Sequence, residues 1–304
     1  MGAYTREDEH LLHASIFLLF TRQPFIKGEP WCVCEGPAFW HNPCKTLSSQ
    51  GSLLQTPTRH PLFPWRRSND WQLGYRKLPY YHHPSLYHDC INASIHFLKS
   101  LKAYGIDPSR VVICGESIGG AAAVVVTQTL LSRTDIPKIR AQVLIYPILQ
   151  AFYFQSPSHL MHKNIPFLTK DFMITCICKY LAIDFSWKDA MLTGACISPS
   201  AWKKYEKWLS PDNIPKRFRT TYQPPESPAP FNEAAYLETK HAMNIDISPL
   251  VADDKIIAQL PEAFLVSLHW DIIRDDVLLY KKRLEDQGVP VTWHHVEDGF
   301  HGND

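Results

Sequence analysis

The run Gly115–Gly119 (GESIG) fits the pattern Gly-x-Ser-x-Gly, which places Ser117 between two glycines. In this pattern the serine occupies a sharp turn from a strand into a helix, and side chains two residues away on either side would collide. The turn exposes the hydroxyl and aims the first backbone N–H groups of the helix at a developing oxyanion. The residues therefore predict a nucleophile elbow, with Ser117 as nucleophile and Ile118 as an oxyanion donor.

The surroundings of the elbow strengthen this interpretation. The apolar run Val111–Cys114 predicts a buried strand, and Ile118–Ser132, with Gly120 in its first turn, predicts a helix. We expect Glu116, beside the nucleophile, to bond nearby loops rather than to serve as the catalytic acid. The alternative is a glycine-rich turn that holds an incidental serine.

A serine hydroxyl needs a base that takes its proton and a carboxylate that fixes the tautomer of the base. In strand–elbow–helix hydrolases these residues follow the serine in the order acid, then histidine. Asp271 comes just after the apolar strand Ala263–Leu268, and His301 lies in the glycine-containing run Glu297–Gly302. We predict Asp271 as acid and His301 as base. The competing acids are Asp275 and Asp276, which suit the first turn of a helix, and Asp298.

Strands and helices alternate along most of the chain, which predicts an α/β fold with a mainly parallel sheet. The expected strands are Val111–Cys114, Ala141–Tyr146, Ala263–Leu268 and Pro290–Val296. The expected helices are Leu86–Tyr104, Ile118–Ser132, Thr169–Ile183, Pro199–Leu209, Phe231–Ala242 and Asp275–Gln287.

The domain organisation follows from these patterns. Residues 1–73 show no sustained period and are predicted to be irregular, apart from the apolar segment Leu11–Phe20. Residues 74–304 are predicted to form the folded domain, with a helical cap inserted at about 148–258. Aromatic and apolar side chains of this insertion could line an acyl pocket or simply pack against the core: Phe152, Tyr153, Phe154, Phe167, Phe172 and Met173.

Composition excludes some classes of partner. The 304 residues carry 31 Lys and Arg against 30 Asp and Glu, so a net charge of +1 gives no electrostatic reason to expect nucleic acid. No apolar run reaches the roughly 18 residues needed to span a bilayer. Eight cysteines include two Cys-x-Cys pairs, Cys32/Cys34 and Cys176/Cys178, whose spacing differs from that of zinc knuckles. We therefore expect no metal site and no cofactor.

From Gly74 to Gly302 the chain resembles the arylacetamide deacetylase-like branch of the hormone-sensitive-lipase group of α/β hydrolases. The matching stretches are GYRKLP (Gly74–Pro79), DPSRVVICGESIGG (Asp107–Gly120), AQVLIYP (Ala141–Pro147), WDIIRDDVLLYKKRLEDQG (Trp270–Gly288) and EDGFHG (Glu297–Gly302). The resemblance implies an α/β-hydrolase fold, with the family's nucleophile at Ser117, its acid at Asp271 and its base at His301. It implies hydrolysis of esters or amides of small lipophilic acyl groups at the endoplasmic reticulum membrane.

The chain also departs from the family pattern. The family's His-Gly-Gly-Gly loop supplies N–H groups to the oxyanion hole, whereas the only His-Gly pair in this sequence is His301-Gly302. The strand before that loop and the amino-terminal membrane anchor have no counterpart in residues 1–73. We therefore expect a fold that lacks its first strands, with one edge of the sheet unpaired, and a chain whose turnover is impaired.

Two functions fit these residues. The first is a serine carboxylesterase that acts on a small lipophilic ester or amide through an acyl-enzyme. The alternative is a catalytically silent hydrolase-fold protein that binds a lipophilic ligand or a partner. The sequence alone leaves the compartment open, and membrane association follows from the resemblance only.

Overall fold

The computed structural model describes residues 16–20, 62–64, 71–162, 165, 167–225 and 229–302. Its strands are β1 (Ile16–Phe20), β2 (Leu62–Pro64), β3 (Trp71–Leu73), β4 (Val111–Glu116), β5 (Ala141–Ile145), β6 (Glu262–Trp270) and β7 (Val291–Phe300). Its α-helices are α2 (Ser85–Ser100), α3 (Ile118–Leu130), α4 (Pro157–Met161), α5 (Lys170–Leu181), α6 (Lys188–Thr193), α7 (Pro199–Leu209), α8 (Glu233–Thr239), α9 (Asp254–Ile257) and α10 (Arg274–Asp286).

The strands form a single sheet in the order β2-β3-β1-β4-β5-β6-β7. Strands β4 to β7 run parallel, whereas β1 is antiparallel to both β3 and β4. The predicted α/β fold with a mainly parallel sheet is confirmed. Because parallel strands present their carboxyl ends at one edge, the loops after β4, β6 and β7 come together there.

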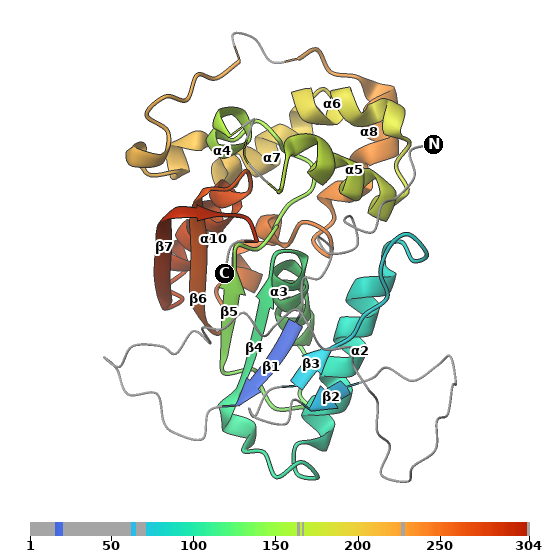
Figure 1. Cartoon of the computed structure of the whole chain (residues 1–304), viewed down its shortest axis with the longest axis vertical. Coiled ribbons are helices and arrows are strands. Elements are labelled where there is room, and N and C mark those ends of the chain that lie inside the picture. The colour runs from blue at the N-terminus through green and yellow to red at the C-terminus, as the bar shows by residue number, and fades with distance from the viewer. Residues whose placement is uncertain are drawn as a thin grey trace.

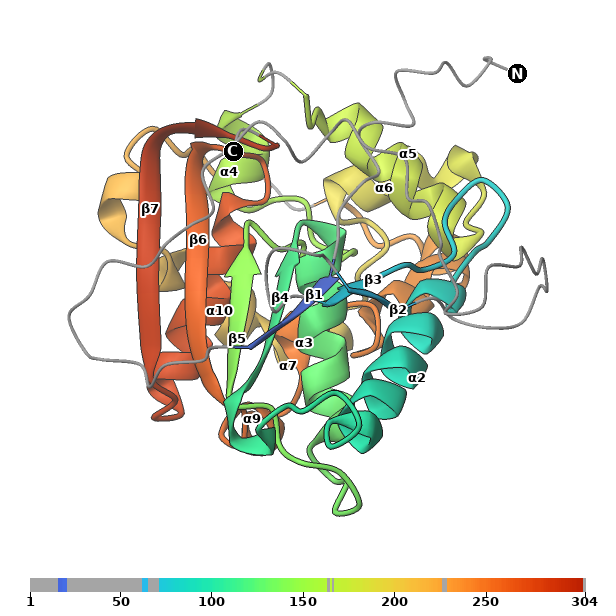
Figure 2. The same ribbon diagram turned by 60° about the horizontal axis from the view of Figure 1, so that its bottom comes forward.

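Helices α2, α3 and α10 cover one face of the sheet (Figure 2). Strands β4, β5, β6 and β7 follow one another across the sheet in one direction, and right-handed crossovers place their connecting helices on the same side. Most of β4 and nearly all of α3 are buried, as the apolar sequence of each predicts. This packed layer fixes the end of β4 and the start of α3, where Ser117 lies.

A helical block lies beyond the carboxyl ends of the parallel strands (top of Figure 1), and it includes α4, α5, α6 and α8. It occupies the insertion predicted between β5 and β6. Helix α7 has the predicted bounds, with Ser198 capping its first turn by accepting a hydrogen bond from the Ala201 N–H. The block covers the edge of the sheet from which the loops after β4 and β6 emerge.

The prediction of an irregular segment at 1–73 is wrong for the residues that form β1, β2 and β3. Strand β1 lies within the apolar segment Leu11–Phe20 and pairs with β4, from Ile16 opposite Gly115 to Phe20 opposite Val111. The missing first strands predict an unpaired edge of the sheet, but β1 pairs with the edge of β4. A run of five apolar residues shows neither helical nor strand periodicity, so its pairing depends on the free edge of β4. The remainder of 1–70 lies outside the described residues.

Among the helices in the described part of the chain, none combines the length and the apolar character that a membrane span requires.

Candidate active site

Ser117 lies at the junction of β4 and α3 in a backbone conformation that side chains rarely adopt, with φ 51° and ψ −121°. A Cβ atom added at Gly115 would lie 2.2 Å from the carbonyl oxygen of Gly119. One added at Gly120 would lie 2.7 Å from the Cβ of Pro147, in the loop after β5. The glycines thus allow the tight turn that the sequence predicts and let α3 start directly against the strand.

The three residues predicted as nucleophile, base and acid lie in one hydrogen-bonded chain. The Oγ of Ser117 is 2.9 Å from Nε2 of His301. The Nδ1 of the same ring is 2.8 Å from Oδ2 of Asp271. These contacts suit transfer of the hydroxyl proton to Nε2, with the carboxylate accepting a hydrogen bond from the Nδ1–H group. The sequence separations, 184 and 30 residues, are bridged by the sheet.

Asp271 is held rigidly where β6 ends. Its side chain has no exposed surface, and its Oδ1 accepts a hydrogen bond of 3.0 Å from the backbone N–H of Ile273. The aspartate therefore presents one oxygen to its own loop and the other to His301. A buried acceptor with both oxygens in use fixes the orientation of the imidazole.

The His301 ring is nearly buried, with 11% of its side chain exposed. The ring of Tyr146 packs against it edge to face, with centroids 4.8 Å apart. The Tyr146 hydroxyl donates a hydrogen bond of 3.4 Å to Glu116. Glu116 thus holds the loop after β5, as the sequence analysis expects of a structural acid, and that loop supports the imidazole.

The first N–H groups of α3 lie directly after Ser117. Ile118 is the first residue of the helix, so its N–H has no acceptor within the helix. The N–H of Ser117 itself donates to the carbonyl of Ile145. Ile118 therefore remains the predicted oxyanion donor. Residues 21–61 lie outside the described residues.

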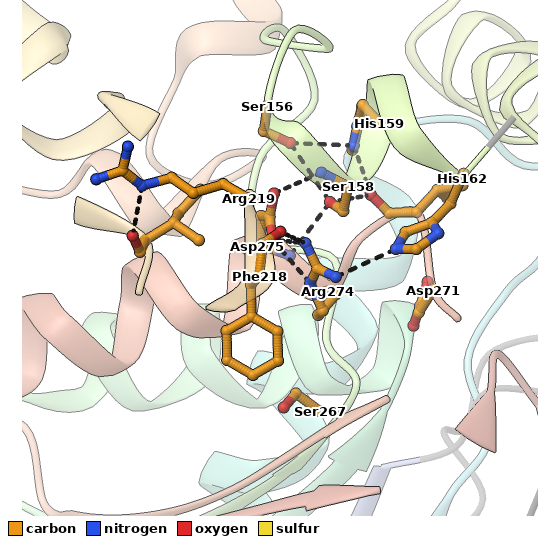
Figure 3. A network of polar contacts seen from close by, with 12 residues as sticks. Ser156, Ser158, His159, His162, Phe218, Arg219, Ser267, Asp271, Arg274 and Asp275 are labelled. Carbon is orange, nitrogen blue, oxygen red and sulfur yellow. Dashed lines mark hydrogen bonds and ion pairs between the residues drawn. The ribbon is translucent and has the colours of Figure 1, made fainter. Parts of the chain in front are cut away.

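The competing acids have other positions. Asp275 and Asp276 lie in the first turn of α10, as predicted, but both are buried. Asp275 accepts a hydrogen bond of 2.6 Å from the N–H of Ser158 and is 2.9 Å from the buried Arg274 guanidinium. Figure 3 shows Arg274 and Asp275 beside Ser158 of the cap, with Asp271 nearby. Asp298 is exposed on β7.

Asp276 binds the start of the segment that leads from β5 into the cap. It accepts hydrogen bonds from the N–H groups of Leu149 and Gln150 and from the Gln150 side chain. Burial raises the pKa of Asp276 to about 7, although these hydrogen bonds lower it. The helix that follows Asp271 therefore anchors the loop after β5 and the first cap helix.

The aromatic and apolar residues proposed for an acyl pocket differ in exposure. Phe152, Tyr153, Phe154 and Met173 are buried, which favours the packing interpretation for them, and Phe172 is partly buried. Phe167 is 55% exposed and stacks on Phe300, the residue before His301, with centroids 5.2 Å apart. Trp270, the residue before Asp271, is also exposed. Exposed aromatic surface therefore lies directly beside the hydrogen-bonded chain.

A cluster of imidazoles that the sequence did not predict lies next to Asp271. His269 and His295 lie on adjacent strands, and both have a nitrogen 3.6 Å from a carboxylate oxygen of Glu297. The cluster depends on the pairing of β6 with β7, which local periodicity does not encode. The only sequence signal is the density of histidines in these two strands.

Comparisons with known proteins agree with this architecture. A family model described as the alpha/beta hydrolase fold matches residues 72–209 and 195–303. A thermostable esterase from Pseudomonas putida superposes with a TM-score of 0.53 at 20% identity, covering 77% of this chain and 56% of that one. A bacterial heroin esterase superposes with a TM-score of 0.52 at 23% identity, over 77% and 56% of the two chains. At these identities the likeness concerns the fold.

Relatives are more similar in sequence. Arylacetamide deacetylase-like 4 of Homo sapiens is 64% identical over 231 residues, which is 76% of this chain and 57% of that protein. Arylacetamide deacetylase of Rattus norvegicus is 33% identical over 91% of this chain and 67% of that protein. The chain spans little more than half the length of the arylacetamide deacetylase-like relatives it matches. The chain belongs to the α/β-hydrolase family, as an arylacetamide deacetylase-like protein of the hormone-sensitive-lipase group.

Proposed function

We propose that this chain is a serine hydrolase of carboxylic esters or amides that acts through an acyl-enzyme. The observation that carries the proposal is the continuous hydrogen-bonded chain from Ser117 through His301 to Asp271. A strained serine at the start of a helix, a nearly buried imidazole and a fully buried carboxylate match the three roles of nucleophile, base and acid.

In the first half of the reaction, His301 Nε2 accepts the proton of Ser117 as Oγ attacks the substrate carbonyl carbon. The imidazolium that forms is stabilised by Asp271, which stays ionised. The carbonyl oxygen becomes an oxyanion facing the Ile118 N–H. Collapse of this intermediate expels the alcohol or amine, which takes the proton from Nε2. Water then attacks the acyl-enzyme with the same imidazole as base, releasing the acid and restoring Ser117.

We further propose that turnover by this chain is slow. The sequence contains no His-Gly-Gly-Gly run, and among the described residues the Ile118 N–H is the donor assigned to the oxyanion. Loss of one oxyanion donor removes about a hundred- to a thousandfold of rate. Because an oxyanion forms in both acylation and deacylation, we expect both half-reactions to be slow.

The proposed substrates are small lipophilic esters or amides. Exposed Phe167 and Trp270 flank the site and offer apolar surface for an acyl group. Relatives named arylacetamide deacetylase and neutral cholesterol ester hydrolase agree with such chemistry. Action at the endoplasmic reticulum membrane is proposed on the family resemblance alone, and subcellular fractionation of the expressed chain tests it.

The decisive experiment is labelling with a fluorophosphonate probe, which reacts with an activated serine. We expect one label at Ser117, located by mass spectrometry, and none in a Ser117→Ala variant. Ser132→Ala, which changes an exposed serine beyond α3, is the matched control and should label normally. A folded wild-type chain that takes no label would contradict the proposal and favour the silent binding protein.

A p-nitrophenyl ester assay then measures turnover. Slow turnover that is abolished in Ser117→Ala would support both the hydrolase and the proposed impairment, and a burst of about one product per chain would show that the acyl-enzyme accumulates. Rapid steady turnover, abolished in Ser117→Ala, would support the hydrolase and contradict the proposed impairment.

A further inference from the structure

Three possible metal ligands meet where β6 and β7 pair irregularly. Leu268 pairs with Val296 and Trp270 with Phe300, so the single residue His269 lies opposite three residues of β7. Glu297 is in that bulge, and His295 lies just before it. One ring nitrogen of His269, one of His295 and a carboxylate oxygen of Glu297 all lie within 4.8 Å of one another.

Both imidazole nitrogens are buried, and neither has a hydrogen-bond partner. The His295 side chain is only 4% exposed. Each of the two nitrogens is 3.6 Å from Glu297 Oε2, which is beyond good hydrogen-bond range. A buried polar atom without a partner is costly, so two of them directed at one carboxylate suggest that something absent from the chain lies between them.

We propose that His269, His295 and Glu297 bind a divalent zinc ion that bridges β6 and β7. Zinc in proteins takes imidazole and carboxylate ligands at about 2.0–2.2 Å in a tetrahedron, which places ligand atoms about 3.3 Å apart. The two distances of 3.6 Å are close to that value. The ring nitrogens of His269 and His295 are at most 4.8 Å apart, so they must approach each other by no more than about 1.5 Å. Water supplies the remaining position from the side of Glu297, which is 67% exposed.

Residues around the proposed site orient the His295 ring for metal binding. The other nitrogen of His295, Nδ1, lies 2.9 Å from the hydroxyl of buried Ser267, which can accept a hydrogen bond from Nδ1–H and so leave the Nε2 lone pair free. Trp293 donates a hydrogen bond to the same hydroxyl.

Two positively charged side chains near the site, Arg217 and Arg274, repel a divalent cation. Arg217 is 3.5 Å from Glu297 Oε1, and its side chain is 56% exposed, so it can move into solvent. Arg274 is fixed and buried, but its charge is compensated by Asp275 at 2.9 Å. Arg217 therefore competes with the ion for Glu297, and its removal should tighten zinc binding.

The site is distinct from the hydrogen-bonded chain of Ser117, His301 and Asp271, and the inference does not depend on the proposed function. It has a structural consequence, since Asp271 is two residues beyond His269 and His301 is four residues beyond Glu297. An ion that joins β6 to β7 would stabilise both strands directly before these residues.

The test is a zinc titration of the whole metal-free chain by calorimetry, in a reducing buffer that keeps the cysteines as thiols. Glu297→Gln should weaken zinc binding about ten- to a hundredfold, and Arg217→Gln should strengthen it severalfold. His294→Ala changes an exposed histidine beside the site and should leave affinity unchanged. Magnesium, which prefers all-oxygen octahedral sites, should not bind.

Two further readouts distinguish this site from zinc bound at thiols. Cobalt substituted for zinc should give a visible d–d spectrum without a thiolate charge-transfer band, and the spectrum should weaken in Glu297→Gln. Saturating zinc should raise the Tm of the wild-type chain more than that of Glu297→Gln. Equal affinity in the wild type and Glu297→Gln, or no tightening in Arg217→Gln, would overturn the proposal whatever the hydrolase assays show.

Discussion

Trp270 and Phe300 pair across β6 and β7, and the residue after each is a member of the hydrogen-bonded chain. The pairing sets Asp271 and His301 side by side, so their contact of 2.8 Å is a direct product of strand register. A shift of one strand past the other by a single residue would separate them. The register of β6 and β7 is therefore as important for the proposed chemistry as the residues themselves.

Replacement of Asp271 by asparagine tests the orientation of the base. Asparagine retains an oxygen for the Ile273 N–H but presents an amide to His301, which favours the wrong tautomer. We expect kcat for an activated ester to fall by about ten-thousandfold, as this substitution does in other triads. Asp298→Asn changes the exposed competing acid and should keep wild-type activity. Equal losses in the two variants would exclude Asp271 as the specific partner of His301.

A methyl group at Gly115 should prevent the elbow from closing. Its Cβ would lie 2.2 Å from the Gly119 carbonyl oxygen and 2.7 Å from the Gly120 nitrogen, and backbone atoms cannot move aside as a flexible side chain can. We expect Gly115→Ala to lower the free energy of unfolding by more than about 3 kcal/mol in urea titrations. Gly288→Ala, at a site with φ +75° and open space, should cost only about 1–2 kcal/mol. Similar losses at both positions would show that the elbow can relax.

Much of this arrangement could be predicted because it follows from local patterns. Runs of apolar residues predict the strand before Ser117 and the helix after it. Capping residues predict the bounds of α7. Asp271 could be found because a parallel sheet presents its loops at the carboxyl ends of strands.

Other features arise only from tertiary contact. Strand β1 is defined by its pairing with β4, and a short apolar run carries no information about its partner. The burial of Asp275 depends on Ser158, 117 residues away in sequence. The imidazole cluster likewise needs the β6–β7 register, so no spacing in the sequence indicates it.

The Arg274–Asp275 ion pair should contribute strongly to attachment of the cap. Both side chains are almost fully buried, and the guanidinium also donates to the carbonyl of Phe218. Arg274→Met would leave the Asp275 charge buried without its partner, and we expect a loss of about 3–5 kcal/mol in the free energy of unfolding. Lys282→Met breaks an exposed pair with Asp286 and should change it by less than about 0.5 kcal/mol. A small effect of Arg274→Met would mean that the cap is attached by other contacts.

His159 should make the fold sensitive to acid. Burial lowers the pKa of His159 to about 3, and the charge of Lys170 lowers it further, while the hydrogen bond to the Ile272 carbonyl raises it. An unfolded histidine has a pKa near 6.5, so the unfolded chain takes up more protons between these values. Stability is therefore full above pH 6.5 and is lost as the pH falls toward 3, by about 2 kcal/mol between pH 7 and pH 5.

Unfolding by urea at a series of pH values checks this expectation. His159→Asn keeps an N–H for the Ile272 carbonyl but cannot titrate, so its stability should depend less steeply on pH in this range. An identical pH dependence in the wild type and the variant would assign the acid sensitivity to other groups.

The separation of 184 positions between Ser117 and His301 also has a consequence for folding. During synthesis the serine leaves the ribosome long before the imidazole that would activate it, and the strands that carry the acid and the base must join the sheet in between. Reactivity of Ser117 would thus appear only in chains that have completed the β4–β7 assembly. An active-site label would count correctly folded molecules in a mixture, whether or not those molecules turn over substrate.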